Sequence, residues 1–220
     1  MTLAIFDLDE TLIAGDSDHA WGEFLISKGL VDAARHRSIN DQFYEDYKNG
    51  NLDVDAYLQF ACEFLTRHPP EQLYRWREMF IEEMIRPIVL PQAQALIGFH
   101  REQQHRLLIV TATNQFITEP IAHLFGIHEL IAPVPELTST GYTGRITGVP
   151  SFGAGKVIRL KSWLQETGET LTGSYFYSDS ANDIPLLEEV DHPCAVDPDS
   201  RLQATAETRQ WRIISLRDQF

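Results

Sequence analysis

Short apolar runs alternate with helical patterns from residue 89 to the end of the chain, and one more apolar run stands at its start. Such short, nearly continuous runs are typical of strands buried on both faces of a parallel sheet. Strands that alternate with helices indicate a doubly wound parallel α/β sheet, in which ligands bind where the strands end. The predicted strands are 3–8, 107–111, 173–178, 193–196 and 212–216, and the predicted helices are 92–103, 119–125 with Pro120 in the first turn, 156–166 and 185–190.

The pattern changes between residues 16 and 88. Apolar and aromatic residues recur there at helical spacing, and breaks at 49–51 and 68–70 separate the helices. We therefore predict an α/β core formed by residues 1–15 and 89–220, with residues 16–88 inserted as a helical cap above the end of the sheet. Residues 133–148 contain a turn-rich stretch between two extended pieces, which predicts a hairpin.

Composition and charge exclude several classes of function. The chain of 220 residues is 43% hydrophobic and carries a formal charge of −14, from 18 Lys and Arg against 32 Asp and Glu. That charge disfavours nucleic acid as a partner, and no apolar run is long enough to cross a bilayer. The start lacks a basic leader, so we expect a cytoplasmic protein. Cys62 and Cys194 lack metal-ligand spacing and are expected to be buried and unpaired.

Acidic pairs follow two of the predicted strands. Asp7 and Asp9 come after the first strand, and Asp179 and Asp183 come after the third. The carboxyl ends of parallel strands lie at one edge of a sheet, so these side chains should converge. Converging carboxylates without a cation are strongly unfavourable, and oxygen ligands suit Mg²⁺. The acids therefore predict a bound Mg²⁺.

Two further residues are candidates for binding an anion at the same edge. Thr111 ends the second strand, and Lys156 opens a helix after Gly153 and Gly155. Taken singly, Thr111 fits a helix cap and Lys156 fits a solvated surface lysine, while Asp179 and Asp183 fit a cap and a first-turn acid. Their conjunction with the first acidic pair favours a site instead.

Competing motifs fail on spacing. An EF-hand loop that started at Asp7 would need glycine where Leu12 stands, and a phosphate-binding P-loop that ended at Lys156 would need glycine in place of Pro150.

The order of these motifs resembles the haloacid dehalogenase superfamily, and within it the subclass typified by phosphoserine phosphatase. The resemblance covers nearly the whole chain, because all four motifs and the position of the cap agree. Ser178 stands where this family usually has glycine before the aspartate, and another small residue should serve there.

The resemblance implies a role for each residue. Asp7 would attack phosphorus to form an aspartyl-phosphate, and Asp9 would protonate the leaving alcohol and later activate water. This second aspartate favours phosphate-ester hydrolysis over dehalogenation. Mg²⁺ would be held by the Asp7 carboxylate, the Asp9 carbonyl and Asp179, with support from Asp183, and the phosphoryl oxygens would be bound by Thr111, Lys156 and Asn182.

The substrate is expected to be a phosphorylated amino alcohol. In the phosphoserine enzymes an acid holds the substrate's ammonium and a cap arginine holds its carboxylate. Here the acid corresponds to Asp16, whereas the arginine position falls near Ala61 and no basic residue lies between Lys48 and Arg67. The stretches 15–19 and 177–180 are similar to bacterial histidinol-phosphatases of this subclass. This implies L-histidinol phosphate, with its ammonium on Asp16 or Asp18 and its ring covered by Trp21.

Alternatives remain open at this point. Phosphoserine or a broad range of small phosphate esters could be the substrate, and a phosphotransferase could use the same aspartyl-phosphate. A non-catalytic, phosphorylation-dependent interaction protein is a hypothesis of another class. The sequence does not determine the oligomeric state.

Overall fold

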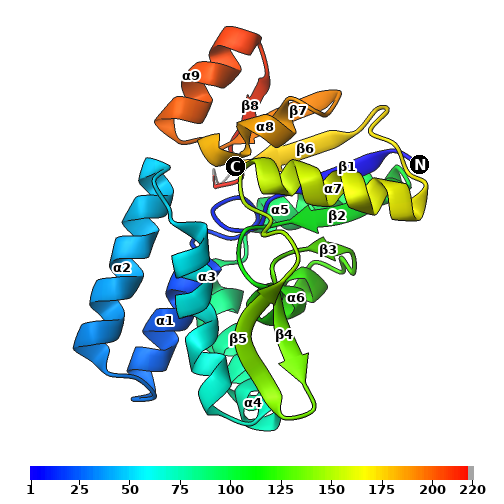
Figure 1. The fold of residues 1–220 in the computed structure, drawn as a ribbon. Coiled ribbons are helices and arrows are strands. Elements are labelled where there is room, and N and C mark those ends of the chain that lie inside the picture. Colours follow the sequence, from blue (N-terminus) through cyan, green and yellow to red (C-terminus); the bar gives the residue numbers. More distant parts are fainter. Residues whose placement is uncertain (218–220) are drawn as a thin grey trace.

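A computed structural model describes residues 1–217 of the chain (Figure 1). The strands are β1 (Leu3–Phe6), β2 (Arg106–Val110), β3 (Leu130–Ile131), β4 (Val134–Thr138), β5 (Gly141–Thr147), β6 (Tyr175–Ser178), β7 (His192–Val196) and β8 (Arg212–Ile214). The α-helices are α1 (Ser17–Ser27), α2 (Ala33–Asn49), α3 (Val54–Glu63), α4 (Pro70–Phe80), α5 (Pro91–Glu102), α6 (Gln115–Leu124), α7 (Ala154–Thr167), α8 (Ile184–Leu187) and α9 (Ser200–Arg209). Shorter 3₁₀ and π turns are η1 (Phe64–Arg67), η2 (Ile81–Ile85), η3 (Arg86–Ile88) and η4 (Ala181–Asp183).

The predicted doubly wound sheet is confirmed. Six strands pair in parallel in the order β3-β2-β1-β6-β7-β8, with β1 in the middle. Strand β3 was not predicted from the sequence, because its two residues are too short to give a periodic signal. Since neighbouring strands run the same way, Asp7, Thr111 and Asp179, which directly follow β1, β2 and β6, lie at one edge of the sheet.

Alternate residues of each strand serve two different cores. In β1, Leu3 and Ile5 pack into a cluster with apolar residues of α7, α8 and α9, whereas Ala4 and Phe6 pack into a cluster with α5, α6 and the cap. A strand with both faces covered needs apolar residues at every position, which explains why the run is continuous.

Helix α6 differs from its predicted form. Pro120 lies inside the helix, not in its first turn, and it has no N–H to donate to the carbonyl of Phe116 four residues earlier. Arg77 of α4 donates to that carbonyl instead, at 2.8 Å. The cap therefore supplies the hydrogen bond that the Phe116 carbonyl lacks because of Pro120. Sequence periodicity does not reveal such a contact.

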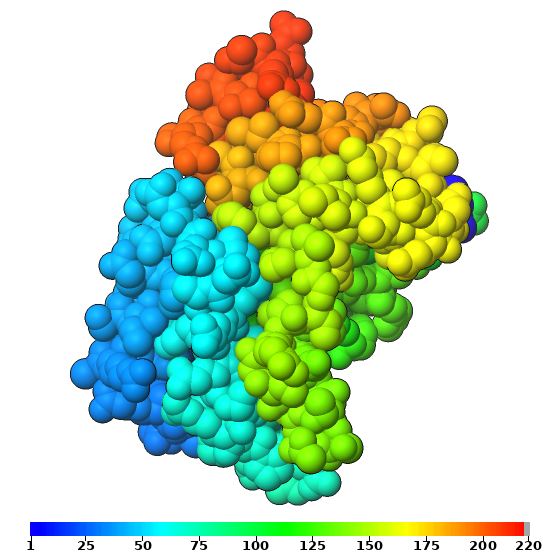
Figure 2. Space-filling model, in the orientation of Figure 1, coloured from blue at the N-terminus to red at the C-terminus, as the bar shows by residue number. Residues whose placement is uncertain are grey.

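The hairpin of β4 and β5 lies against the cap, although the sequence assigned it to the core. The Tyr142 hydroxyl of β5 lies 3.4 Å from the hydroxyl of Tyr74 in α4, and Gly144 approaches the side chain of Thr66 in η1. Figure 2 shows the two as adjoining surfaces, the cap in blue to cyan and the hairpin in yellow-green. The cap thus packs against a segment that is far from it in sequence.

Cys62 and Cys194 are both buried and free, as expected. Among residues 1–217, none of the helices combines the length and the apolarity that a bilayer crossing requires.

Candidate active site

The loop after β1 holds Asp7 and Asp9 in fixed directions. The Asp7 N–H donates to the carbonyl of Tyr177 at 2.9 Å, which extends the pairing of β1 with β6 by one residue. The chain then turns back, with Leu12 N–H donating to Leu8 O at 2.8 Å and Glu10 N–H donating to Gly15 O at 3.0 Å. The two carboxylates are therefore placed by backbone hydrogen bonds and not by a flexible loop.

Lys156 is buried and paired with two of the predicted acids. Its Nζ lies 2.8 Å from Asp7 Oδ1 and 2.8 Å from Asp183 Oδ2. Burial disfavours the ammonium, but the charges of Asp183 and Asp7 outweigh it and raise the pKa of Lys156. Asp183 also accepts a hydrogen bond from Ser178 Oγ at 2.7 Å. The alternative of a solvated surface lysine is thus excluded, and Lys156 bridges the carboxylates of Asp7 and Asp183.

Thr111 lies at the same sheet edge and is almost fully buried. Its Oγ1 accepts from Thr113 N–H at 3.1 Å, and its carbonyl accepts from Ser151 Oγ at 2.6 Å. Asn182 is turned toward the cap, where its amide donates to the carbonyl of Tyr47 at 3.2 Å. Its proposed role on a phosphoryl oxygen therefore stays a prediction.

Asp9 is held by two residues that the sequence did not single out as its partners. Ser17 N–H, at the start of α1, lies 2.6 Å from Asp9 Oδ1, and Thr113 Oγ1 lies 2.9 Å from Asp9 Oδ2. Burial and the nearby Asp16 charge raise the pKa of Asp9 to about 7, against these hydrogen bonds. A carboxyl group that titrates near neutral pH is suited to both donating and accepting a proton.

Asp179 follows β6, the strand that pairs with β1, and its charge interacts with that of Asp7. Thr11 donates to Asp179 Oδ1 at 2.9 Å and accepts from the Asp179 N–H at 3.1 Å. Burial and the Asp7 charge raise the pKa of Asp179 well above its ordinary value. Burial likewise raises the pKa of Asp7 to about 7, although Lys156 opposes the shift.

The oxygen atoms of these acids are the ligands that a hard divalent cation prefers. No cluster of three or more His, Cys, Asp or Glu side chains suited to a metal occurs within residues 1–217. The ligand set that we expected contains only two carboxylates, those of Asp7 and Asp179, together with the backbone carbonyl of Asp9. Because one lysine offsets the three carboxylates of Asp7, Asp179 and Asp183, the surplus of negative charge fits a divalent cation.

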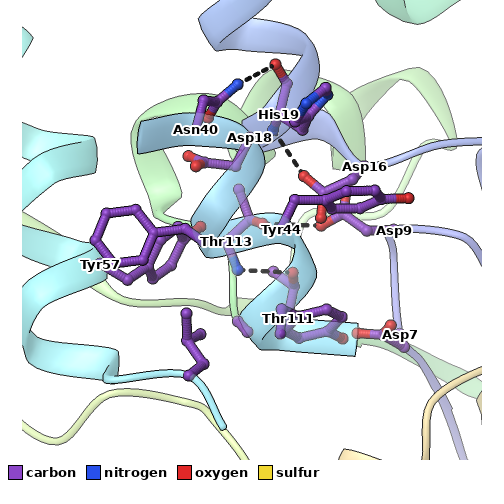
Figure 3. Close-up of a pocket in the computed structure, with 14 residues that line it drawn as sticks. Asp7, Asp9, Asp16, Asp18, His19, Asn40, Tyr44, Tyr57, Thr111 and Thr113 are labelled. Atoms are coloured by element: carbon purple, nitrogen blue, oxygen red, sulfur yellow. Dashed lines mark hydrogen bonds between the residues drawn. The ribbon is translucent and has the colours of Figure 1, made fainter. Parts of the chain in front are cut away.

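A pocket opens between this edge of the sheet and the cap. Figure 3 shows Asp7 at one end and Asp18, His19 and Asn40 at the other, with Thr111 and Thr113 between them. The lining residues are Asp7, Asp9, Asp16, Asp18, His19, Asn40, Phe43, Tyr44, Tyr47, Leu52, Tyr57, Thr111, Ala112 and Thr113. All of these belong to the described part of the chain, and none is a lysine or an arginine.

Asp16 and Asp18 both line the pocket, in agreement with their predicted position. Asp16 caps α1 by accepting from His19 N–H at 2.7 Å. Asp18 is only 8% exposed, and its nearest amide donor, Asn114 Nδ2, is 3.5 Å away. Burial raises the pKa of Asp18 to about 7, against a hydrogen bond with Tyr57. Asp18 is thus a buried carboxylate that has no cation paired with it in the described residues.

The cap contributes three tyrosines to the pocket that were not predicted from the sequence. Tyr44 and Tyr47 lie three residues apart on one face of α2, and Tyr57 comes from α3. Asn40, Tyr44 and Tyr47 are spaced four and three residues apart, which places them on one side of α2. This spacing was the signal from which a polar face of the helix could have been predicted.

Trp21 does not line this pocket, contrary to the prediction. It is 3% exposed and packs among aromatic rings of the cap and of α6, with ring centroids 5.2 to 6.2 Å away, at Phe24, Phe64, Phe80 and Phe116. Helical spacing of large aromatic residues identifies a buried face but not which cavity it meets. Trp21 therefore stabilises the junction of cap and core.

Comparison with known proteins places the chain in a family. The family model of haloacid dehalogenase-like hydrolases matches residues 4–188. A histidinol-phosphatase of Neisseria meningitidis is 46% identical over 219 residues, which cover 98% of this chain and 99% of that protein. A phosphoserine phosphatase of Mycobacterium tuberculosis is 30% identical over 225 residues, which cover 97% of this chain and 70% of that protein.

Solved structures agree with this placement. The crystal structure of a protein with unknown function from Bordetella pertussis superimposes with a TM-score of 0.92 at 43% identity, over 98% of this chain and 100% of that one. A substrate-bound phosphoserine phosphatase complex has the same fold, with a TM-score of 0.71 at 16% identity over 97% of this chain and 92% of that one. The chain therefore belongs to the haloacid dehalogenase-like hydrolase family, as an enzyme of the phosphatase branch that its named relatives represent.

Proposed function

We propose that the protein is a Mg²⁺-dependent phosphomonoester hydrolase that transfers the phosphoryl group to Asp7 and then to water. The single observation that carries this proposal is the Asp7 carboxylate, fixed 2.8 Å from the buried Lys156 at one end of a pocket that has the carboxylates of Asp16 and Asp18 at its other end. The proposed substrate is a small phosphorylated amino alcohol, with L-histidinol phosphate as the best candidate.

The chain's own residues account for each step of the proposed reaction. An Asp7 oxygen attacks phosphorus, so that one P–O bond forms as the bond to the leaving alcohol breaks. Lys156, which is bonded to Asp7, and the buried Thr111 would stabilise the charge on the phosphoryl oxygens. Asp9 gives its proton to the departing oxygen, and it then takes a proton from the water that hydrolyses the aspartyl-phosphate.

Mg²⁺ would be held by the carboxylates of Asp7 and Asp179 and by the carbonyl of Asp9. When bound, it would neutralise charge on the phosphoryl group and on the nucleophile. Asp183 would support this arrangement indirectly, through the ion pair that it forms with Lys156.

The walls of the pocket support a substrate with a positive charge and no carboxylate. The carboxylates of Asp16 and Asp18 would bind an ammonium group of the substrate. The rings of Tyr44 and Tyr57 would contact the apolar part of the substrate next to that group. Because no lysine or arginine lines the described pocket, a substrate carboxylate would be left without a counterion. The 46% identity to a histidinol-phosphatase supports the same choice.

A panel of phosphomonoesters assayed with Mg²⁺ tests the substrate. We expect histidinol phosphate to have the highest kcat/KM, and faster turnover of phosphoserine would contradict the argument from the missing counterion. An enzyme inert toward every ester would favour the non-catalytic interaction protein. Transfer of phosphate to an added alcohol in preference to water would favour the phosphotransferase.

A further inference from the structure

Arg217, which follows β8, contacts the loop that carries Asp9. Arg217 donates from one guanidinium nitrogen to the backbone carbonyl of Glu10 at 2.8 Å, and the same nitrogen pairs with the Glu10 carboxylate. Its other terminal nitrogen lies 3.5 Å from Asp197 Oδ2 in the loop after β7. One side chain thus joins the loops that follow two different strands to the C-terminal segment.

Both of these loop residues have backbone conformations that side chains disfavour. Glu10 has φ of 55° and Asp197 has φ of 42°, which is the left-handed region that glycine normally occupies. Only four non-glycine residues in the described chain have positive φ, and Arg217 contacts two of them. Such conformations persist where surrounding contacts hold them, and they cluster at functional sites.

The conformation of Glu10 has a direct consequence for Asp9. The Asp9 carbonyl belongs to the peptide unit that ends at the Glu10 nitrogen, so rotation about φ of Glu10 changes the direction of that carbonyl. Glu10 N–H also donates to Gly15 O at 3.0 Å, which fixes the same peptide unit from its other side. Arg217, acting on the carbonyl and the carboxylate of Glu10, secures the residue about which this rotation occurs.

We propose that Arg217 is a positioning residue that holds the Asp9 carbonyl in the direction required to bind Mg²⁺. The proposal rests on the proposed function, in which that carbonyl is a metal ligand. Arg217 acts through Glu10 and touches neither substrate nor metal. Its side chain is 34% exposed, so its removal leaves no buried cavity.

Isothermal titration calorimetry of the full-length protein with Mg²⁺ alone measures Mg²⁺ binding and tests the proposal without relying on turnover. Arg217→Ala should weaken Mg²⁺ binding by about 10-fold to 100-fold, as is typical when a residue that supports a metal ligand is lost. At low Mg²⁺ the kcat of this variant should fall, and excess Mg²⁺ should restore it. Arg212→Ala is the matched control, because Arg212 in β8 is exposed, carries the same charge and has no contact with Glu10.

Two further variants separate positioning from folding. Glu10→Gln keeps the backbone bond from Arg217, so its loss of affinity should be smaller than that of Arg217→Ala. Arg217→Lys cannot engage the carboxylate and the carbonyl together as a planar fork does, so it should lie between the wild type and Arg217→Ala even if the alanine variant folds poorly.

The inference would be overturned if Arg217→Lys and Arg217→Ala bound Mg²⁺ as tightly as Arg212→Ala does. The same holds if the thermal midpoint falls while affinity is unchanged, because that pattern indicates a purely structural role. A wild-type protein that neither binds Mg²⁺ nor hydrolyses phosphate esters would instead overturn the proposed function, and this inference with it.

Discussion

Replacing Asp18 with asparagine should make the enzyme less active and more stable at once. Asp18 is 8% exposed, and burial raises the pKa of its carboxyl from 3.8 to about 7. Between these two values the folded protein binds more protons than the unfolded chain, so this group lowers stability as pH rises from about 4 to about 7. Above pH 7 the accumulated penalty is at most about 4 kcal/mol.

Asparagine keeps the shape of the side chain and removes the charge. At pH 8 we therefore expect the free energy of unfolding of the variant to rise by up to about 4 kcal/mol in the absence of substrate, and to be nearly unchanged at pH 4. With substrate, loss of the ammonium partner should cost about 2 to 4 kcal/mol of transition-state binding, which is a fall in kcat/KM of about 30-fold to 1000-fold.

Urea unfolding at pH 4 and pH 8, together with steady-state kinetics on histidinol phosphate, measures both effects. Asp55→Asn is the matched control, because Asp55 lies exposed on α3 of the same cap and loses the same charge. It should change stability by no more than about 0.5 kcal/mol. An Asp18→Asn variant with wild-type kcat/KM and no gain in stability would refute the assignment of Asp18 to a cation.

Three further outcomes follow from the site and from the core. Lys156→Met should reduce kcat at least about 10³-fold and destabilise the fold by about 3 to 5 kcal/mol in urea unfolding, because Asp7 and Asp183 lose their buried partner; a variant that keeps activity would contradict this. Removal of Mg²⁺ with a chelator should abolish turnover, and at 100 times the dissociation constant Mg²⁺ should stabilise the fold by about 2.7 kcal/mol in thermal unfolding; turnover that persists in chelator would count against the metal. Burial and the neighbouring His105 lower the pKa of His100 from 6.5 to about 4, so stability should fall by up to about 3 kcal/mol as pH drops from 6.5 to 4. His100→Phe should lack this loss, and equal pH slopes for the two proteins would exclude His100 as its source.

The sheet edge could be predicted from the sequence because its signals are local. A strand buried on both faces is a continuous apolar run, and an acid directly after it must lie at the end of the sheet, as Asp7 and Asp179 do. Lys156 was predicted at the same edge as a candidate for binding an anion, because it opens a helix after Gly153 and Gly155. The structure places its Nζ 2.8 Å from Asp7 Oδ1.

The cap pocket could not be predicted in the same way. Trp21 and Tyr44 both lie on helices with aromatic residues at regular spacing, yet one is packed in the cap core and the other lines the pocket. Which face meets which cavity depends on how the helices cross, and that depends on residues distant in sequence, such as Arg77 and the hairpin. The cytoplasmic location and the absence of a nucleic-acid partner stay predictions.

The central claim is that Asp7 carries the phosphoryl group during turnover. Acid quench during the reaction with histidinol phosphate and Mg²⁺, followed by peptide mapping in a mass spectrometer, tests it directly. We predict a phosphorylated peptide modified at Asp7, lost when Mg²⁺ is chelated and absent in Asp7→Asn. Steady turnover by the wild-type protein with no covalent phosphate at Asp7, or with phosphate on another side chain, would contradict the account.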